Sequence, residues 1–217
     1  MILNPSAELV RERIQGIQER KVRQPVMYQM LIDGRVSEVV GKYYPKGSDY
    51  EVATWKGNPV IIFHVKTAKT EGPKIRYAAL PLDPHYEPWA QEMLECFERA
   101  GESRVFKIKK RTLQDLVKPY FQGFQYTIEA YGTMKEEAYT KVSEHPRNFL
   151  THGIRHTRAQ ELMMQYGFDN IDLALFGGWK LAKELRQSAM ARYLYSSGSW
   201  VRYIGKLFQE KAVLKFT

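Results

Sequence analysis

The segment LTHGIRHTRAQELMMQYG carries a histidine and an arginine at a spacing that suits the binding of a small anion. His152 and Arg155 are three residues apart in a stretch expected to be helical, so both side chains leave the same face. Taken alone the pattern is weak, because such a pair on a solvated helix usually contacts only water or a nearby acid. His156 is expected to support the site rather than to enter it.

Three further segments carry residues that could act with this helix. IDGRVSEVV contains Arg35 and Glu38, KTAKTEGPKIRYAALPL is rich in lysine, and GGWKLAKELRQSAMARYLY contains Trp179 and two tyrosines. Each has an ordinary interpretation as well. Arg35 and Glu38 could form a surface ion pair worth well under ~1 kcal/mol, hairpin lysines are usually solvated, and Trp179 could be a core aromatic.

In this order the segments resemble the tyrosine recombinase and integrase family. The catalytic domain of that family carries an Arg followed by S-E or A-E, a β-hairpin Lys, H-x-x-R, a His or Trp, and finally a Tyr. The resemblance covers about residues 25–195, and GRVSE and HGIRHT match best. It implies an α+β fold, predominantly helical with a small three-stranded antiparallel sheet, and an enzyme that cuts and rejoins DNA through a phosphotyrosine.

The resemblance also implies the site residues. The expected catalytic residues are Arg35, Lys69, His152, Arg155, Trp179 and Tyr193, with Glu38 and His156 in supporting roles. Two assignments stay open within the sequence. Lys69 competes with Lys66 and Lys74 on the hairpin, and Tyr193 competes with Tyr195 and, more distantly, with Tyr203.

The chemistry suits these residue types. Attack on a phosphodiester builds negative charge on the nonbridging oxygens, which two arginines can stabilise without a metal ion. A phenol with a pKa near ~10 needs a proton acceptor, a role for His152. A hairpin lysine can protonate the departing 5′ oxygen. Indole N–H donates but cannot accept, so Trp179 would be a phosphate or packing contact.

The expected partner is double-stranded DNA, on which the chain would self-associate as a dimer to tetramer, with no cofactor and no metal. Two alternatives stay open. A type IB topoisomerase resembles recombinases in its Arg, Lys, His and Tyr set, and a non-catalytic DNA-binding module derived from an integrase would keep only the basic surface.

The elements that must position these residues can be outlined from periodicity and turn signals. Ser6 is expected at the start of a first helix, and a second helix is expected to begin at Pro25 and to break at Gly34. The stretches EVATW, NPVIIFHV and KIRYAALPL predict three antiparallel strands. Helices are predicted at the following ranges: 86–100, the stretch TLQDLVKPYFQGF, 149–166, 170–176 and 179–195, with a short strand near QYTIEAYG.

Three segments are expected: an N-terminal helix or linker at 1–24, the catalytic domain at 25–195, and a basic tail at 196–217 that packs on a neighbouring protomer. The 217 residues are 44% hydrophobic, which is enough for one large core. The formal charge of +9 indicates a polyanionic partner. A single cysteine, Cys96, excludes an intrachain disulfide, and no apolar run approaches the ~20 residues of a membrane span. A cytoplasmic, DNA-associated protein is expected.

Overall fold

The computed structural model describes residues 1–67, 75–127, 146–179 and 196–209. The three predicted antiparallel strands are present as β2 (Tyr50–Trp55), β3 (Asn58–Lys66) and β4 (Ile75–Pro81), in the order β2-β3-β4. Most of the other described elements are helices. The predicted α+β fold class is therefore confirmed.

Helix α2 (Arg20–Leu31) is the centre of the fold, because it contacts α1 (Ala7–Gln15), α4 (Ala90–Ala100), α5 (Lys110–Val117) and α7 (Thr151–Met164). It is apolar on nearly every side from Val26 onward, as expected of a helix surrounded by others. The prediction that it begins at Pro25 is wrong. Proline favours a helix start, but here Val22 packs into the core one turn earlier, and tertiary contacts extend the helix back to Arg20.

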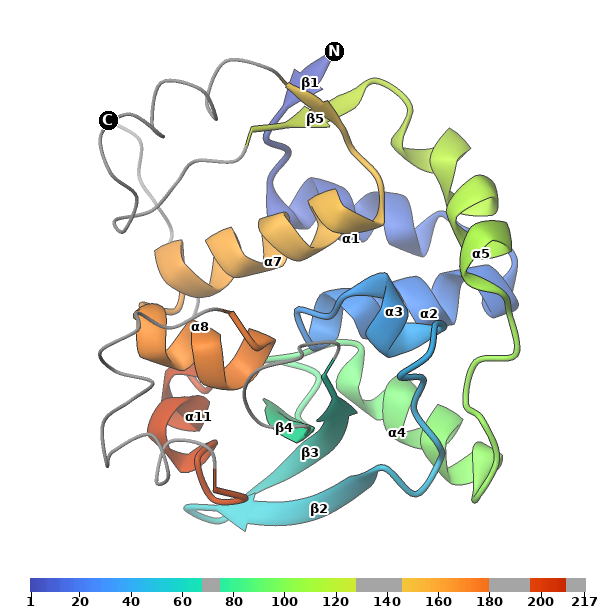
Figure 1. The fold of residues 1–217 in the computed structure, drawn as a ribbon. Helices are drawn as coiled ribbons and strands as arrows, with labels where there is room; N and C mark the ends of the chain where they lie inside the picture. Colours follow the sequence, from blue (N-terminus) through green and yellow to red (C-terminus); the bar gives the residue numbers. More distant parts are fainter. Residues whose placement is uncertain (68–74, 128–145, 180–195, 210–217) are drawn as a thin grey trace.

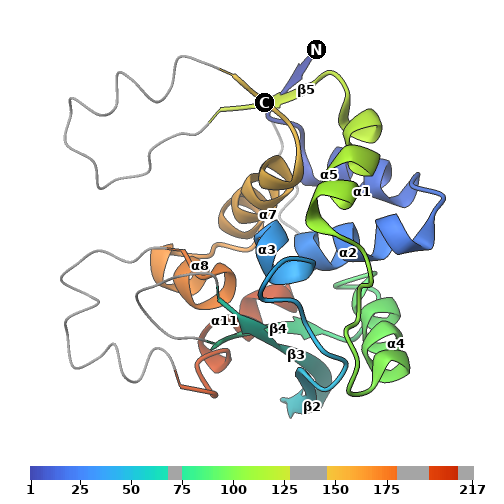
Figure 2. The same cartoon turned by 45° about the vertical axis from the view of Figure 1, so that its right-hand side comes forward.

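Helix α1 begins as the sequence predicts. The Ser6 hydroxyl accepts the Leu9 N–H at 3.3 Å, and Val10 and Ile14 are buried in the same core as α2. Figures 1 and 2 show α2 and the short α3 (Val36–Val39) between α7 on one side and the β2-β3-β4 sheet on the other.

A second sheet was not predicted from the sequence. It joins β1 (Ile2–Leu3), β5 (Phe124–Tyr126) and β6 (Arg147–Asn148) in the order β1-β5-β6, with β1 parallel to β5. β5 overlaps the start of the short strand predicted near QYTIEAYG. β1 and β6 are too short to show an alternating pattern, and pairing between distant segments alone defines them. A 3-10 turn at Lys118–Phe121 links α5 to β5.

The edge strand β4 is covered by α8 (Asn170–Gly177) and α11 (Val201–Leu207), which both contact it. The Tyr203 hydroxyl donates to the Tyr77 carbonyl at 2.7 Å and accepts the Ala79 N–H at 2.9 Å, so it caps the outer edge of β4. Residues 196–209 of the expected basic tail thus pack on their own chain. Packing of the tail 196–217 on a neighbouring protomer stays a prediction, and residues 210–217 lie outside the described ones. None of the described helices has the length and apolar character needed to cross a bilayer.

Candidate active site

A buried carboxylate, Glu38, joins the first motif to the H-x-x-R helix. Its Oε1 accepts from the Arg35 guanidinium at 3.0 Å, and its Oε2 accepts the Arg35 backbone N–H at 2.9 Å. The same Oε2 lies 3.9 Å from an Arg155 nitrogen. Two arginines that are far apart in the sequence therefore meet at one acid.

The interpretation of Arg35 and Glu38 as a surface ion pair is wrong, because the Glu38 side chain is fully buried. Burial acts to raise the pKa of Glu38, but the charges of Arg76, Arg155 and Arg35 together hold it below its ordinary value. Glu38 is therefore ionised at neutral pH and orients the cations around it. Arg35 keeps 32% of its side chain exposed and can reach a ligand in solvent.

Arg155 lies on the buried side of α7. One terminal nitrogen donates to the Gly177 carbonyl at 2.8 Å, and the other makes no hydrogen bond. Burial lowers the pKa of Arg155 to about 10, with Asp33 and Glu38 opposing this effect and Arg35 and Arg76 adding to it. Burial makes the charged form of Arg155 less favourable, and a bound anion would stabilise that charge. The site therefore suits a phosphate ligand.

Sequence reasoning missed Arg76, which is buried on β4. One of its terminal nitrogens donates to Glu38 at 3.2 Å, and the other donates to the Phe176 carbonyl at the end of α8. It thereby ties the sheet to the same acid as Arg35. A charged residue inside the apolar run IRYAALPL is the signal that could have revealed it, since a buried arginine requires partners.

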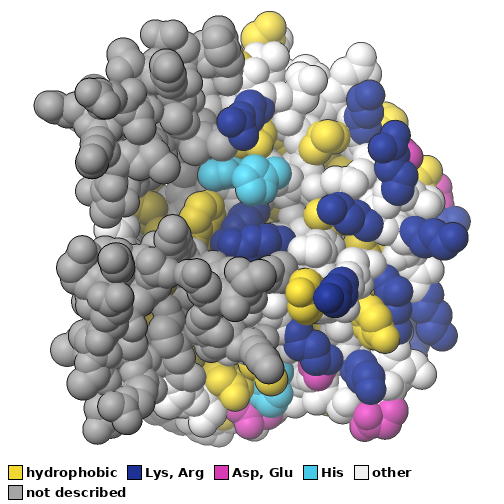
Figure 3. Space-filling view, viewed as in Figure 1, with side chains coloured by type: hydrophobic (Ala, Val, Ile, Leu, Met, Phe, Trp, Pro, Cys, Tyr) yellow, Lys and Arg dark blue, Asp and Glu magenta, His cyan; other side chains and the backbone are white. Residues whose placement is uncertain are grey.

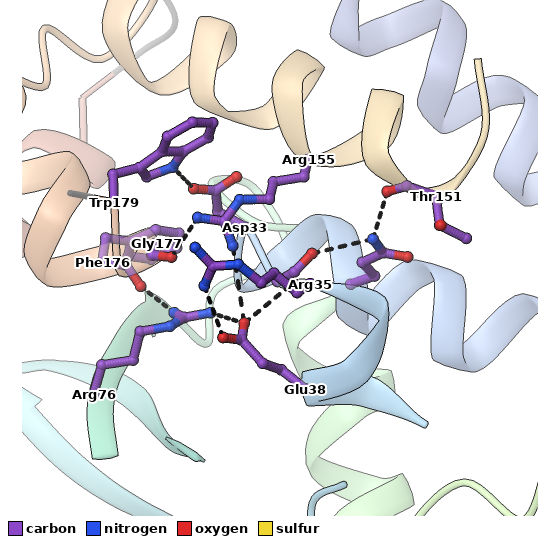
Figure 4. A network of polar contacts seen from close by, with 11 residues as sticks. Asp33, Arg35, Glu38, Arg76, Thr151, Arg155, Phe176, Gly177 and Trp179 are labelled. Atoms are coloured by element: carbon purple, nitrogen blue, oxygen red, sulfur yellow. Dashed lines mark hydrogen bonds and ion pairs between the residues drawn. The ribbon is translucent and has the colours of Figure 1, made fainter. Parts of the chain in front are cut away.

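Two further polar residues, Asp33 and Gln29, were also missed. The Asp33 carboxylate accepts the indole N–H of Trp179. The Gln29 amide donates to the Gly34 carbonyl at 3.1 Å and to the Thr151 carbonyl at 2.6 Å, which holds the turn before Arg35 against the start of α7. Figure 4 shows these groups converging from α2, the following turn, β4, α7 and the end of α8. Gly34 was interpreted as a helix breaker, and Asp33 before it was given no role.

Trp179 was expected to be a phosphate or packing contact, and in this structure it packs. Its ring lies over the Arg155 guanidinium at 4.5 Å and has its centroid 5.5 Å from that of His156. Its single N–H is bonded to Asp33. Trp179 therefore forms a wall of the arginine site.

The two histidines of α7 lie with ring centroids 4.7 Å apart, and His156 stacks on Tyr126 at 5.2 Å. Burial and the charges of Arg155, Arg147 and Arg35 lower the pKa of His152. Burial, His152 and the nearby arginines lower the pKa of His156 to about 4. Both rings are therefore neutral at pH 7, and His152, which is exposed, can accept a proton.

The remaining candidates divide into described and undescribed residues. Lys69, Lys74, Tyr193 and Tyr195 lie outside the described residues, so their assignments stay predictions. Lys66 pairs with Asp49 at 2.6 Å. Tyr203 is fully buried, and burial raises its pKa, which makes it unsuitable as a nucleophile. Within the described ranges, no group of three or more His, Cys, Asp or Glu residues is arranged to hold a metal ion.

A basic surface borders the site. In Figure 3 histidine side chains lie near the middle of the visible face, and Lys and Arg side chains gather beside them with few acidic ones between. Exposed cations of the segments around α3, α5 and β6 form this surface, which we call the basic face. They are Lys42, Lys107, Lys109, Lys110, Arg111, Lys118 and Arg147. Helix α5 adjoins α7, where Gln114 donates to the Thr151 hydroxyl at 3.4 Å.

No protein-family model and no curated protein matches the sequence. Among solved structures, the fold is similar to the catalytic core of lambda integrase, with 16% sequence identity and a TM-score of 0.47 over 82% of this chain and 92% of that chain. A similarity of this size concerns the fold alone.

Proposed function

We propose that this chain breaks and rejoins DNA by a tyrosine recombinase reaction, in which a tyrosine attacks a phosphodiester and forms a 3′-phosphotyrosine. The observation that carries the proposal is the meeting of Arg35 and Arg155 at the buried Glu38. An acid that holds two arginines in one place preorganises cationic donors for a phosphate. Such preorganisation is the largest single contribution to many enzymatic rate enhancements.

In the proposed reaction the scissile phosphate binds between Arg35 and Arg155. Arg35 contributes from its exposed side, and Arg155 contributes the nitrogen that makes no hydrogen bond in the free protein. Both guanidinium groups would face the nonbridging oxygens, whose negative charge grows as the fifth oxygen adds to phosphorus. The interaction therefore strengthens on the way to the transition state, which is the condition for faster chemistry.

The proton transfers are assigned to His152 and Lys69. The lowered pKa keeps His152 unprotonated at neutral pH, so it can take the phenolic proton of the attacking tyrosine, for which we propose Tyr193. Lys69 would protonate the 5′ oxygen as the DNA strand leaves. Rejoining runs the same steps in reverse, with the 5′ hydroxyl as the nucleophile and the tyrosine as the leaving group, so the reaction needs no external energy source.

The basic face would hold the DNA backbone on either side of the scissile phosphate. Lysine and arginine contacts to phosphates are independent of sequence, so this surface would supply affinity and register and would leave the target sequence to other contacts. Recombination joins two DNA sites, and we therefore propose that copies of the chain associate on DNA.

The proposal is tested with a suicide substrate, a duplex nicked next to the cleavage site so that the released strand end diffuses away and rejoining is blocked. The wild-type chain should become covalently attached to the 3′ phosphate, and the attachment should persist in EDTA. Tyr193→Phe should abolish the adduct, whereas the matched variants Tyr195→Phe and Tyr203→Phe should keep it. Loss of the adduct only in Tyr195→Phe would move the nucleophile by two residues.

The competing activities give different products on the same DNA. Strand exchange between two sites supports a recombinase, and relaxation of a single supercoiled plasmid without exchange supports a type IB topoisomerase. A chain that shifts DNA in a gel but forms no adduct with any substrate would be a binding module, and the proposed chemistry would be wrong.

A further inference from the structure

A second buried acid, Asp33, stands beside the arginine site and has no part in the proposed reaction. It lies in the turn between α2 and α3, and its side chain is fully buried. One carboxylate oxygen accepts the Trp179 N–H, and the other has no hydrogen-bond partner. An ionisable group in such a position needs a physical reason, since burial of an incompletely bonded carboxylate is unfavourable.

The backbone supplies no such reason. Asp33 has a φ of 51°, in the left-handed region where glycine is favoured and asparagine is well tolerated. A residue without a charge would therefore serve the turn at least as well. The carboxylate is explained by what it contacts rather than by the conformation of the chain.

Asp33 is linked to Arg155 through a chain of contacts that includes Trp179. Asp33 holds the indole of Trp179, the indole ring lies 4.5 Å from the Arg155 guanidinium, and Arg155 donates to the Gly177 carbonyl at 2.8 Å. A Cβ at Gly177 would collide with the Asp33 carboxylate, so glycine is required there for the acid to approach. The turn before the first motif and the segment after α8 are thus joined through Arg155.

We infer that Asp33 is a positioning residue for DNA cleavage, which fixes Trp179 against Arg155 and supplies the countercharge that keeps this arginine in place until a phosphate arrives. The inference rests on the proposed function. Asp33 would not touch the DNA. It would act through Trp179 and Arg155. Its removal would leave Arg155, the second arginine that binds the phosphate, less firmly positioned, and would remove no cation from the basic face.

The charges around Asp33 agree with this role. Arg155 and Arg158 on α7 and Arg76 on β4 all act to keep the carboxylate ionised, and the Trp179 hydrogen bond does the same. Burial outweighs them and raises the pKa of Asp33 to about 6. The acid is therefore ionised at pH 8, where it opposes the effect of burial on Arg155.

The inference is tested first without any reaction. In the full chain with ¹⁵N-labelled tryptophan, Trp179→Phe identifies the Trp179 indole signal among those of Trp55, Trp89 and Trp200. That signal should shift between pH 5 and pH 7, and Asp33→Asn should abolish the shift while the indole signal remains dispersed as in a folded protein. An indole signal that does not change with pH in the wild type would overturn the inference.

The second readout is the rate of adduct formation on the suicide substrate at pH 8. Asp33→Asn should slow this step at least tenfold while DNA affinity changes less than twofold, and the surface control Asp83→Asn should match the wild type. Trp179→Phe should slow cleavage as well, and the double variant should be little slower than either single one, because Asp33 and Trp179 act through the same arginine, Arg155. Asp33→Asn with wild-type cleavage would refute the inference alone, whereas a wild type without any adduct would refute the proposed function and this role with it.

Discussion

Asp33 is a buried acid whose charge lowers the free energy of unfolding of the protein. The pKa of this acid rises from 3.8 to about 6 on folding, mainly because of burial. Between these two values the folded chain binds a proton that the unfolded chain does not, so stability falls as the pH rises through about 6. A residue retained at such a cost is typical of functional sites, where activity and stability compete.

Asp33→Asn should therefore be more stable than the wild type at pH 8. The shift of the Asp33 pKa corresponds to about 3 kcal/mol in the free energy of unfolding, and asparagine can still accept the Trp179 N–H. Urea unfolding followed by circular dichroism at pH 8 and pH 4.5 measures the difference, which should shrink at the lower pH. A variant less stable than the wild type at pH 8 would mean that the charge itself holds the fold together.

His152 is the residue whose protonation should decide the activity. Its pKa lies below the ordinary value of 6.5 because of burial and the neighbouring arginines, so the accepting form prevails at neutral pH. Cleavage should be insensitive to pH between 7 and 8.5 and should decline at lower pH as Asp33, whose pKa is about 6, and His152 become protonated.

His152→Asn should lower the rate of adduct formation by about 10²–10⁴, the usual contribution of a general base. Single-turnover cleavage measures this rate, and DNA affinity from a gel shift serves as the control because His152 carries no charge at pH 8. A variant that cleaves at the wild-type rate would assign proton acceptance to another group.

Among the elements, α1 contacts the H-x-x-R helix and shares a second cluster of buried charges with it. Arg158 on α7 donates to Glu161 at 2.5 Å and to Glu87 at 2.9 Å, and Arg11 of α1 lies 3.3 Å from Glu161 and 3.4 Å from Glu87. Arg158 is completely buried, and the two glutamates outweigh its burial and raise its pKa. This cluster anchors α7, on which His152 and Arg155 depend for their placement.

Arg158→Ala should lower the free energy of unfolding by about 3–5 kcal/mol, because it leaves two buried carboxylates without their main partner. Urea unfolding at pH 7.5 measures the change. The matched control is Arg111→Ala, which breaks the exposed i,i+4 pair with Asp115 and should have little effect. Equal losses in the two variants would mean that the cluster does not anchor α7.

For the molecule as a whole, the excess of positive charge is organised rather than uniform. The basic face lies beside the arginine site, whereas the cations of α11, Arg202 and Lys206, are bound to Asp169 and Asp172. These ion pairs hold α11 to the start of α8. Their cations already have acidic partners and are less available to bind DNA than the cations of the basic face. The formal charge of +9 therefore does not show that some cations are exposed beside the arginine site while others are paired with acids.

If the basic face binds DNA, affinity should fall steeply with salt. Lys109→Ala with Lys110→Ala should weaken binding to any duplex and reduce the slope of log affinity against log salt by about 2. Fluorescence anisotropy between 50 and 300 mM salt measures the slope. Lys56→Ala, at the β2–β3 turn away from α5 in both views, is the control and should leave the slope nearly unchanged. A double variant with the wild-type slope would remove α5 from the interface.

The sequence by itself determined the local features of this protein. Helical spacing places His152 and Arg155 within one turn of α7, the β-branched and aromatic runs define the three strands, and Ser6 and Gly178 cap their helices as their residue types predict. These features depend on neighbours within a few residues, so the amino-acid order contains them.

Only the tertiary structure decided which distant groups meet. Glu38 was recognised as part of a motif, but its burial between Arg35, Arg76 and Arg155 depends on three separate segments packing together. The same holds for Asp33 with Trp179 and for the short sheet β1-β5-β6. Such contacts leave no periodic trace in the sequence, because a buried charge is set by the groups that surround it in space and not by those beside it in the chain.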